Sequence, residues 1–309
     1  MSKTSCKKTN IFFYSAVVML VALFLCIGCK NVADESDFSF LNSAAGKSLY
    51  AQVPFGQNGA GLDAYLKKAS TEQVNRIELT GLTQEDLKAK KDKTSKLAKI
   101  LQENPDKKID LKFDGAIENL TEMCYSFAGC TNLVSAPEIP KTVTKMDGCF
   151  KGCTSLAKAP VIPDGVTDLD YCFEGCTALT EMPLIPNSVT DLTGCFKNCT
   201  ALTKVSKIPD SINVMSSAFE GCTALQQGPE IPFSSEMNIA TCFKGCSELR
   251  SVTLNCNYIS ESNFGKAFEN CLNLDDGGIQ VPAEQLPMYI ARASVMGTTP
   301  DKFKSKSGS

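Results

Sequence analysis

One apolar pattern repeats from about residue 120 onward: a small residue, Phe, two variable residues, Cys, two more variable residues and Leu. Seven copies are present, and their Phe residues are spaced by 23 residues four times, then by 24 and 25. The Phe positions are Phe127, Phe150, Phe173, Phe196, Phe219, Phe243 and Phe268. One copy cannot bury its own apolar face, so the pattern predicts copies stacked into a solenoid.

Each copy also shows an internal order of elements. Leu133 to Ile139 has the spacing of a short extended segment that ends at an Ile-Pro step, and Val143 to Met146 begins a second one. Phe and Cys lie three apart, which puts two side chains on the same face of a helical turn. We therefore expect ladders of Phe, Cys, Leu and Ile in the core of an α/β repeat.

The repeats between Leu120 and Leu274 resemble the BspA-like leucine-rich repeats, also called treponemal-type repeats. Several copies here have Cys before Phe, where that family usually has Ala. The resemblance implies a leucine-rich-repeat solenoid of 23-residue repeats, curved as a horseshoe. It also implies a protein of the bacterial cell surface, often one linked to adhesion, without identifying what this chain binds.

Residues 60–118 are expected to form an N-terminal α/β cap on the first repeat. Val74–Leu79 and Ile109–Phe113 alternate in polarity as strands do. Thr83 has the character of a helix N-cap, and the apolar residues that follow it as far as Leu101 predict one helix. A further short helix is expected at Leu62–Ala69. This strand–helix–strand order resembles the N-terminal caps of treponemal-type repeat proteins.

The other end of the repeats, 119–281, also needs a cap because the last copy would otherwise expose its apolar ladder. Residues 282–309 are expected to supply it. Ala283 to Met296 predicts an amphipathic capping helix. Lys302 to Ser309 predicts a frayed tail.

Residues 1–28 have the features of an export signal. Three lysines precede an apolar run from Ile11 to Ile27. The run ends at Gly28, and Cys29 follows, which resembles a bacterial lipobox in which the Cys receives a lipid. The match departs at Cys26, where Leu is usual. The alternatives are an uncleaved membrane anchor of minimal length and a cleaved signal without lipid.

Residues 29–59 are rich in small and polar residues and predict a flexible tether. With the lipid at Cys29, the mature chain would be anchored in the bacterial cell envelope. The outer membrane and the cell surface are the expected location.

Composition narrows the chemistry. The 309 residues carry a formal charge of −3 and contain no His and no Trp. A weakly acidic chain lacks the basic surface that binds nucleic acid. Without His, the commonest general acid and base is missing, although Lys, Tyr and carboxylates remain. We expect no enzyme activity and no cofactor.

The 16 cysteines allow three interpretations. Seven belong to the ladder, and four more precede Phe, at Cys149, Cys172, Cys195 and Cys242; other copies have Ser126, Ala218 and Ala267 there. That exchange favours small, buried side chains and free thiols. Disulfides between neighbouring copies are a second possibility, and a metal held by two Cys four apart is a third, although the spacing is not typical of zinc sites. We expect no metal.

The first extended segment of each copy should line the concave face. Its outward positions change in charge and size from copy to copy, which is typical either of a binding surface or of drift on a solvated face. The candidate partner-binding residues are Lys158, Val161, Glu181, Leu184 and Lys204.

These features favour a cell-surface lipoprotein that binds a protein through its repeats in an adhesin-type role. The ligand would be a host matrix protein or another bacterial surface protein, and the chain is expected to be a monomer. The alternative is a periplasm-facing structural lipoprotein that scaffolds an envelope complex.

Overall fold

The computed structural model describes residues 49–91 and 93–306. The expected export signal, the expected lipid site at Cys29 and most of the expected tether lie outside the described residues. By its internal contacts the chain divides between Leu49 and Tyr50. Among the helices that the structure describes, none has the length and apolar character needed to cross a bilayer.

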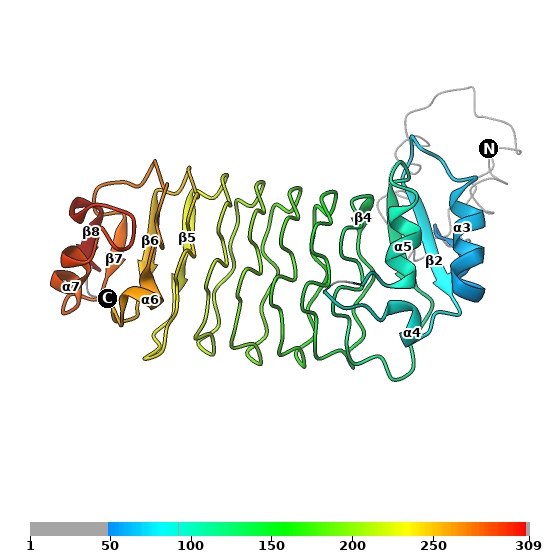
Figure 1. Cartoon of the computed structure of the whole chain (residues 1–309), viewed down its shortest axis with the longest axis horizontal. Helices are drawn as coiled ribbons and strands as arrows, with labels where there is room; N and C mark the ends of the chain where they lie inside the picture. Colours follow the sequence, from blue (N-terminus) through cyan, green and yellow to red (C-terminus); the bar gives the residue numbers. More distant parts are fainter. Residues whose placement is uncertain (1–48, 92, 307–309) are drawn as a thin grey trace, which may run out of the picture. The chain divides into compact units, whose positions relative to one another are not determined.

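The N-terminal part of the described chain is a parallel four-stranded sheet with helices packed on it (Figure 1). Its strands, in the order β1-β2-β3-β4, are β1 (Ala51–Pro54), β2 (Asn75–Thr80), β3 (Ile109–Phe113) and β4 (Leu133–Ser135). Its helices are η1 (Gln57–Gly59), α3 (Ala60–Leu66), α4 (Gln84–Leu87) and α5 (Lys96–Gln102). Because β4 belongs to the first repeat, the cap continues directly into the solenoid.

The cap differs from the sequence-based expectation at two points. Residues 51–59, expected in the tether, form β1 and η1, because the side chains of Val53 and Phe55 are buried against the cap. The single expected helix is two, α4 and α5. Thr83 and Asp86 close a capping box at the start of α4, and Ser95 caps α5. The lysine-rich stretch between them offers no apolar side to bury.

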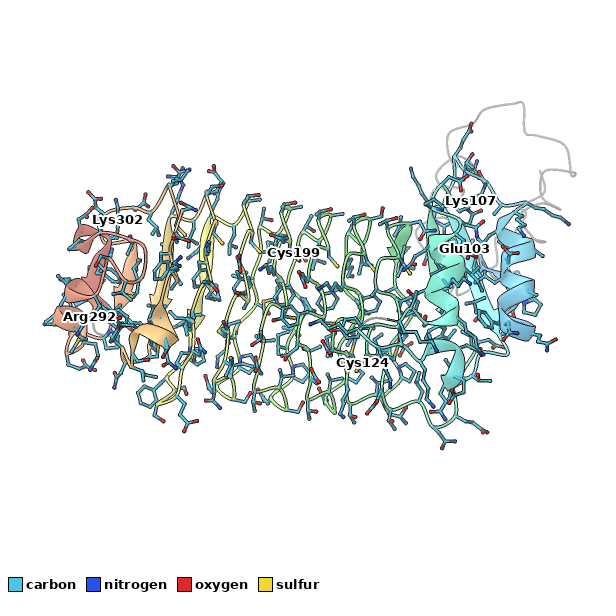
Figure 2. All side chains as sticks on the ribbon, in the orientation of Figure 1. Glu103, Lys107, Cys124, Cys199, Arg292 and Lys302 are labelled. Atoms are coloured by element: carbon cyan, nitrogen blue, oxygen red, sulfur yellow. The ribbon has the colours of Figure 1, made fainter. Side chains whose placement is uncertain are left out.

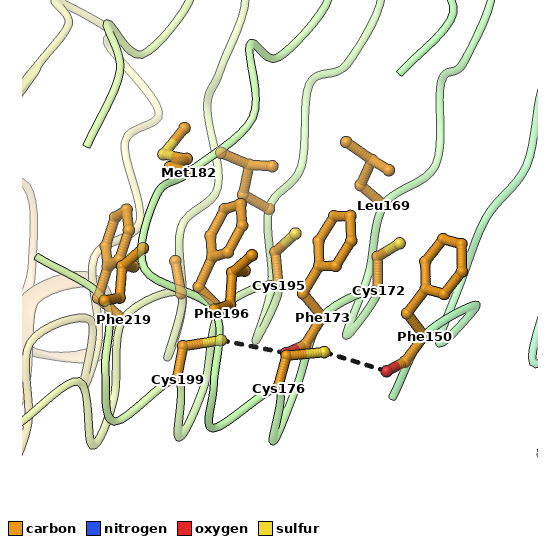
Figure 3. Packing of buried hydrophobic residues seen from close by; sticks show 14 of the residues in the cluster. Phe150, Leu169, Cys172, Phe173, Cys176, Met182, Cys195, Phe196, Cys199 and Phe219 are labelled. Carbon is orange, nitrogen blue, oxygen red and sulfur yellow. Dashed lines mark hydrogen bonds between the residues drawn. The ribbon is translucent and has the colours of Figure 1, made fainter. Parts of the chain in front are cut away.

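The repeats stack as successive rungs whose Phe rings form one ladder (Figure 3). From Phe127 to Phe268 the ring centroids of neighbouring rungs are 5.3–5.7 Å apart, and the rings are within 11° of parallel. All seven rings are buried. The Phe173 N–H also donates to the Cys195 carbonyl of the next rung at 2.9 Å, so backbone and side chains are paired across the same step.

The turn after each Phe is tighter than an α-helical turn. The Cys176 N–H donates to the Phe173 carbonyl three residues earlier, at 3.1 Å. The residue between them, Gly175, has a φ of 72°, and its equivalent Asn198 has a φ of 59°. Gly and Asn are the residues that adopt this left-handed conformation most readily, which explains why this position holds one or the other in every copy.

The strands of the central repeats are shorter than the expected extended segments. After β4 the next strands are β5 (Gln227–Ile231) and β6 (Ser251–Leu254). The rungs between β4 and β5 are joined by isolated parallel bridges, such as the one between Glu181 and Lys204. Pro160 and Pro183 lie in these segments, and a proline has no N–H to give to a ladder.

The C-terminal part closes the stack with a second parallel sheet, β5-β6-β7-β8. Its remaining elements are α6 (Glu261–Phe264), β7 (Ile279–Val281), α7 (Leu286–Ala291), η2 (Pro300–Lys302) and β8 (Phe303–Ser305). The expected capping helix is therefore present as the shorter α7, whose buried Tyr289 donates its hydroxyl to the Cys256 carbonyl at 2.9 Å.

The expected frayed tail is wrong for the residues up to Lys306. β8 pairs with β7, and Phe303 is buried in the cap. The Lys302 ammonium pairs with the Asp276 carboxylate at 2.7 Å, and the labelled Lys302 lies beside this last sheet in Figure 2. The buried side chain of Phe303 holds this last strand in place, and a single apolar residue leaves no periodic pattern in the sequence.

Candidate functional site

Two large apolar side chains stand out of the repeat surface into solvent. Val161 is 85% exposed and Leu184 is 80% exposed. They occupy the same position of neighbouring rungs, between a Pro and a buried Ile. Because Ile162 and Ile185 point into the core, the residue before each is directed outward. Their exposure is therefore built into the repeat and does not arise from a loose loop.

Val161 and Leu184 lie in one open groove of about 800 Å³. The groove extends over three rungs, and Lys158 and Lys207 are among the residues that line it. Prolines from the three rungs contribute much of the remaining surface. We call this surface the Val161–Leu184 groove. It combines an apolar centre with a charged rim, as protein-binding surfaces commonly do.

The remaining candidates form a charged column beside the groove. The Lys204 ammonium donates to the Glu181 carboxylate, an ion pair that lowers the pKa of Glu181. Lys158, on the preceding rung, further lowers the pKa of Glu181. All three side chains are exposed. The structure thus brings Lys158, Val161 and Leu184 into one groove, whereas Glu181 and Lys204 pair on the neighbouring surface.

Sequence reasoning missed part of the groove rim. Asp164 and Asp210 follow the Ile-Pro steps of their rungs and line the groove. Lys207 occupies the position equivalent to Leu184, one rung further on, and pairs with Asp210 at 3.5 Å. The signal that could have found them is positional, because aligning the residues on either side of each Ile-Pro step gives these columns directly.

The cysteines of the repeats are free thiols with structural contacts. All but Cys124 and Cys271 are buried, and the label in Figure 2 places Cys199 within the stack of rungs. The Cys199 thiol donates to the Phe173 carbonyl at 3.2 Å. Burial raises the pKa of Cys176 to about 12, so its reactive thiolate form is suppressed. These contacts favour the thiol interpretation over the disulfide one.

No group of three His, Cys, Asp or Glu side chains in the part of the chain that the structure describes has an arrangement that could hold a metal ion.

A cluster of carboxylates lies on the second extended segments. Burial of Asp170, together with the negative charges of Asp191, Asp168 and Asp147, raises its pKa to about 7. The pKa of Asp147 is raised as well, mainly by burial. The Asp168 carboxylate accepts a hydrogen bond from the Asp170 N–H at 3.2 Å, which makes it a local turn contact. This cluster therefore bears on stability.

Comparisons with known proteins found one family model and solved structures of leucine-rich repeat proteins. The family model for the BspA type leucine-rich repeat region matches residues 111–226 and 171–290, with six copies. A Treponema pallidum leucine-rich repeat protein, TpLRR, is 24% identical over 54% of this chain and 78% of that one, with a TM-score of 0.43. A leucine-rich repeat protein from Bacteroides ovatus is 20% identical over 56% and 68%, with a TM-score of 0.25.

No curated protein matches the sequence. The family model, in contrast, matches two overlapping stretches that together run from residue 111 to residue 290. They cover more than half of the 309 residues. The chain therefore belongs to the family of proteins with BspA type leucine-rich repeats.

Proposed function

We propose that this chain is a bacterial cell-surface lipoprotein that binds a protein through the Val161–Leu184 groove, in an adhesin-type role. Leucine-rich repeats generally mediate contacts between proteins, and BspA-type repeat proteins are typically found on bacterial surfaces. The observation that carries the proposal is the pair of exposed apolar side chains in one groove of a regular stack. A protein ligand, from host matrix or another bacterial surface, fits that chemistry.

The energetics favour this pair as the anchor of an interface. Val161 and Leu184 are mostly solvated, and full burial of an aliphatic side chain is worth ~1.5–3 kcal/mol. The residues around them are held by rung-to-rung contacts, so little ordering free energy is lost on binding. Interfaces commonly depend on a few such side chains, with charged residues at the rim setting specificity.

The residues of the groove support a catalytic role less than they support protein binding. The chain has no His, and the groove is lined by Lys, Asp, Pro and aliphatic residues. The repeat thiols, which could act as nucleophiles, are mostly buried and have raised pKa values. Leucine-rich repeat proteins of this family serve as scaffolds without enzyme activity, and we assign this chain the same character.

The anchor is a separate part of the proposal and rests on the sequence alone. The apolar run followed by Gly28 and Cys29 supports lipid attachment at Cys29. Substituting Cys29→Ala should release the protein from the membrane fraction, because two or more acyl chains anchor durably. Unchanged retention of the variant would favour a spanning segment instead.

The binding site can be tested by placing a photo-crosslinking amino acid at position 161 and, as a control, at position 200. Thr200 is exposed on the turn after Cys199 and does not line the groove. In intact cells we expect protein adducts from position 161 and few from position 200. Equal adduct formation at both positions, or none, would contradict the groove as the binding site.

The alternative of a periplasm-facing scaffold gives a different result in the same cells. An externally added protease should cut the displayed protein in intact cells. A protein that is cut only after the outer membrane is permeabilised would favour the scaffold.

A further inference from the structure

The residues around the Val161–Leu184 groove follow a pattern that reverses across its centre. The position directly before the Ile of the Ile-Pro step is occupied in four successive rungs by Glu138, Val161, Leu184 and Lys207. All four side chains are exposed. The outer two carry opposite charges and the inner two are apolar. Read in the reverse order, this column is therefore its own complement.

The columns on either side have one pair of opposite charges each and no pair of like charges when they are read against their own reverse. The position after the Ile-Pro step is occupied in the same four rungs by Lys141, Asp164, Asn187 and Asp210. Here the outer two have opposite charges, and the inner two are an acid and an amide. The column on the other side reads Ser135, Lys158, Glu181 and Lys204. Its inner two have opposite charges, and its outer two are a hydroxyl and an ammonium.

A two-fold axis explains all three columns together. If it runs parallel to the rungs, between those of Val161 and Leu184, two copies meet face to face with their stacks in opposite directions. Each column then opposes itself in reverse order. Glu138 faces Lys207 of the second copy and Val161 faces Leu184. Such an interface uses the same patch on both subunits, as the commonest homodimers do.

The opposite arrangement fails on charge. A two-fold axis that runs along the stack and through the column of Val161 and Leu184 would keep each rung facing the same rung of the second copy. Glu138 would then meet Glu138, and Lys207 would meet Lys207. Opposed like charges weaken association and select against that orientation.

We propose that the groove binds a second copy of this chain, paired antiparallel about the axis between the Val161 and Leu184 rungs. The inference rests on the proposed function, since it uses the same groove and adds a second copy of this chain to the proteins that the groove binds. Four rungs ~4.8 Å apart make a small patch. Its area falls below the ~800 Å² per partner of a standard interface, in the range of weak and transient complexes. Anchoring both copies on one membrane would raise their effective concentration.

The test is complementation between two charge variants of the purified full chain in detergent. Glu138→Lys alone puts like charges opposite each other at two places in the dimer, and so does Lys207→Glu. Each variant alone should dimerise about tenfold more weakly than wild type in sedimentation, from the usual range of exposed ion pairs. An equimolar mixture restores both pairs and should dimerise as well as wild type. The Thr200→Asp variant serves as the control that leaves dimerisation unchanged.

A trapping experiment keeps the result decisive if the dimer is very weak. Positions 138 and 207 of one chain are three rungs apart, which is ~14 Å and too far for a disulfide. A disulfide between these two positions therefore has to join two chains. Mixing Glu138→Cys with Lys207→Cys under mild oxidation should give a disulfide-linked pair, and neither variant alone should. Wild type under the same conditions controls for the native thiols.

The outcomes separate this inference from the proposed function. Monomers at all concentrations with no trapped pair, or a dimer indifferent to Glu138→Lys, would overturn the inference. Photo-adducts from position 161 that contain a different protein would leave the proposed function standing in that case. Absence of any adduct from position 161 would remove both.

Discussion

The thiol of Cys176 donates a hydrogen bond to the backbone carbonyl of Phe150, one rung earlier, at 3.2 Å. The contact recurs along the stack, for example between Cys222 and Phe196 at 3.1 Å. The Phe150 carbonyl also accepts the backbone N–H of Cys153 at 3.0 Å, so the thiol is its second donor inside the stack. The ladder cysteines therefore have a polar role in addition to filling volume, whereas Cys172, before Phe173, only fills a small buried site.

The two kinds of cysteine should respond differently to serine. In Cys176→Ser the hydroxyl can donate to the Phe150 carbonyl, so the loss of stability should stay below ~1 kcal/mol. In Cys172→Ser the buried hydroxyl lacks the acceptor that Ser126 finds at the Leu87 carbonyl of α4, at 2.8 Å. Its cost should be ~1–3 kcal/mol. Denaturant unfolding measures both, with Cys172→Ala as the control; equal costs would contradict the assignment.

Acidity should stabilise the repeats through Asp170. Its folded pKa is about 7, above the ordinary value of 3.8, so the folded state binds more protons than the unfolded state between these limits. Stability therefore falls as pH rises from about 4 to about 7. Asp170→Asn should melt a few degrees higher than wild type at pH 8 and show little difference at pH 4. A variant with an unchanged pH profile of melting would show that Asp170 is solvated.

A tyrosine covers a glycine in the next rung, and the glycine should be irreplaceable. A Cβ at Gly194 would lie 2.4 Å from the ring of Tyr171, and Gly194 has a φ of 59°. Gly194→Ala should therefore cost ~1–3 kcal/mol. Gly165→Ala is the matched control, because its Cβ would find no atom nearer than 3.9 Å. The double change with Tyr171→Ala should recover part of the loss, and no recovery would mean that the backbone alone sets the cost.

Much of the repeat architecture follows from the sequence because the same physical constraint acts seven times. Phe173 and Phe196 stack because equal spacing places them at equal positions in neighbouring rungs. The exposure of Val161 and Leu184 follows from their position next to a buried Ile. Repetition converts a weak local preference into a strong periodic signal, and this explains why the core and the centre of the groove were predictable.

The parts without repetition were harder to predict. β1 depends on Val53 and Phe55 in an otherwise polar stretch, and β8 depends on Phe303 in a lysine-rich tail. Each gains its order from a sheet edge formed by distant residues, which periodicity cannot detect. The break between α4 and α5 follows from local caps, at Thr83 and at Ser95, on either side of a lysine-rich stretch. In the groove, the complementary charges come from different rungs and become apparent only when the rungs are aligned.

The most direct test of the central claim is the affinity of the Leu184→Asp variant for the protein captured through position 161, compared with Thr200→Asp. Both changes add one negative charge at an exposed site, and only the first lies in the groove. Both variants must first melt as wild type does. The account predicts at least a tenfold loss of affinity for Leu184→Asp, from the burial of one aliphatic side chain, and no loss for Thr200→Asp. Equal affinities of the two variants would contradict it.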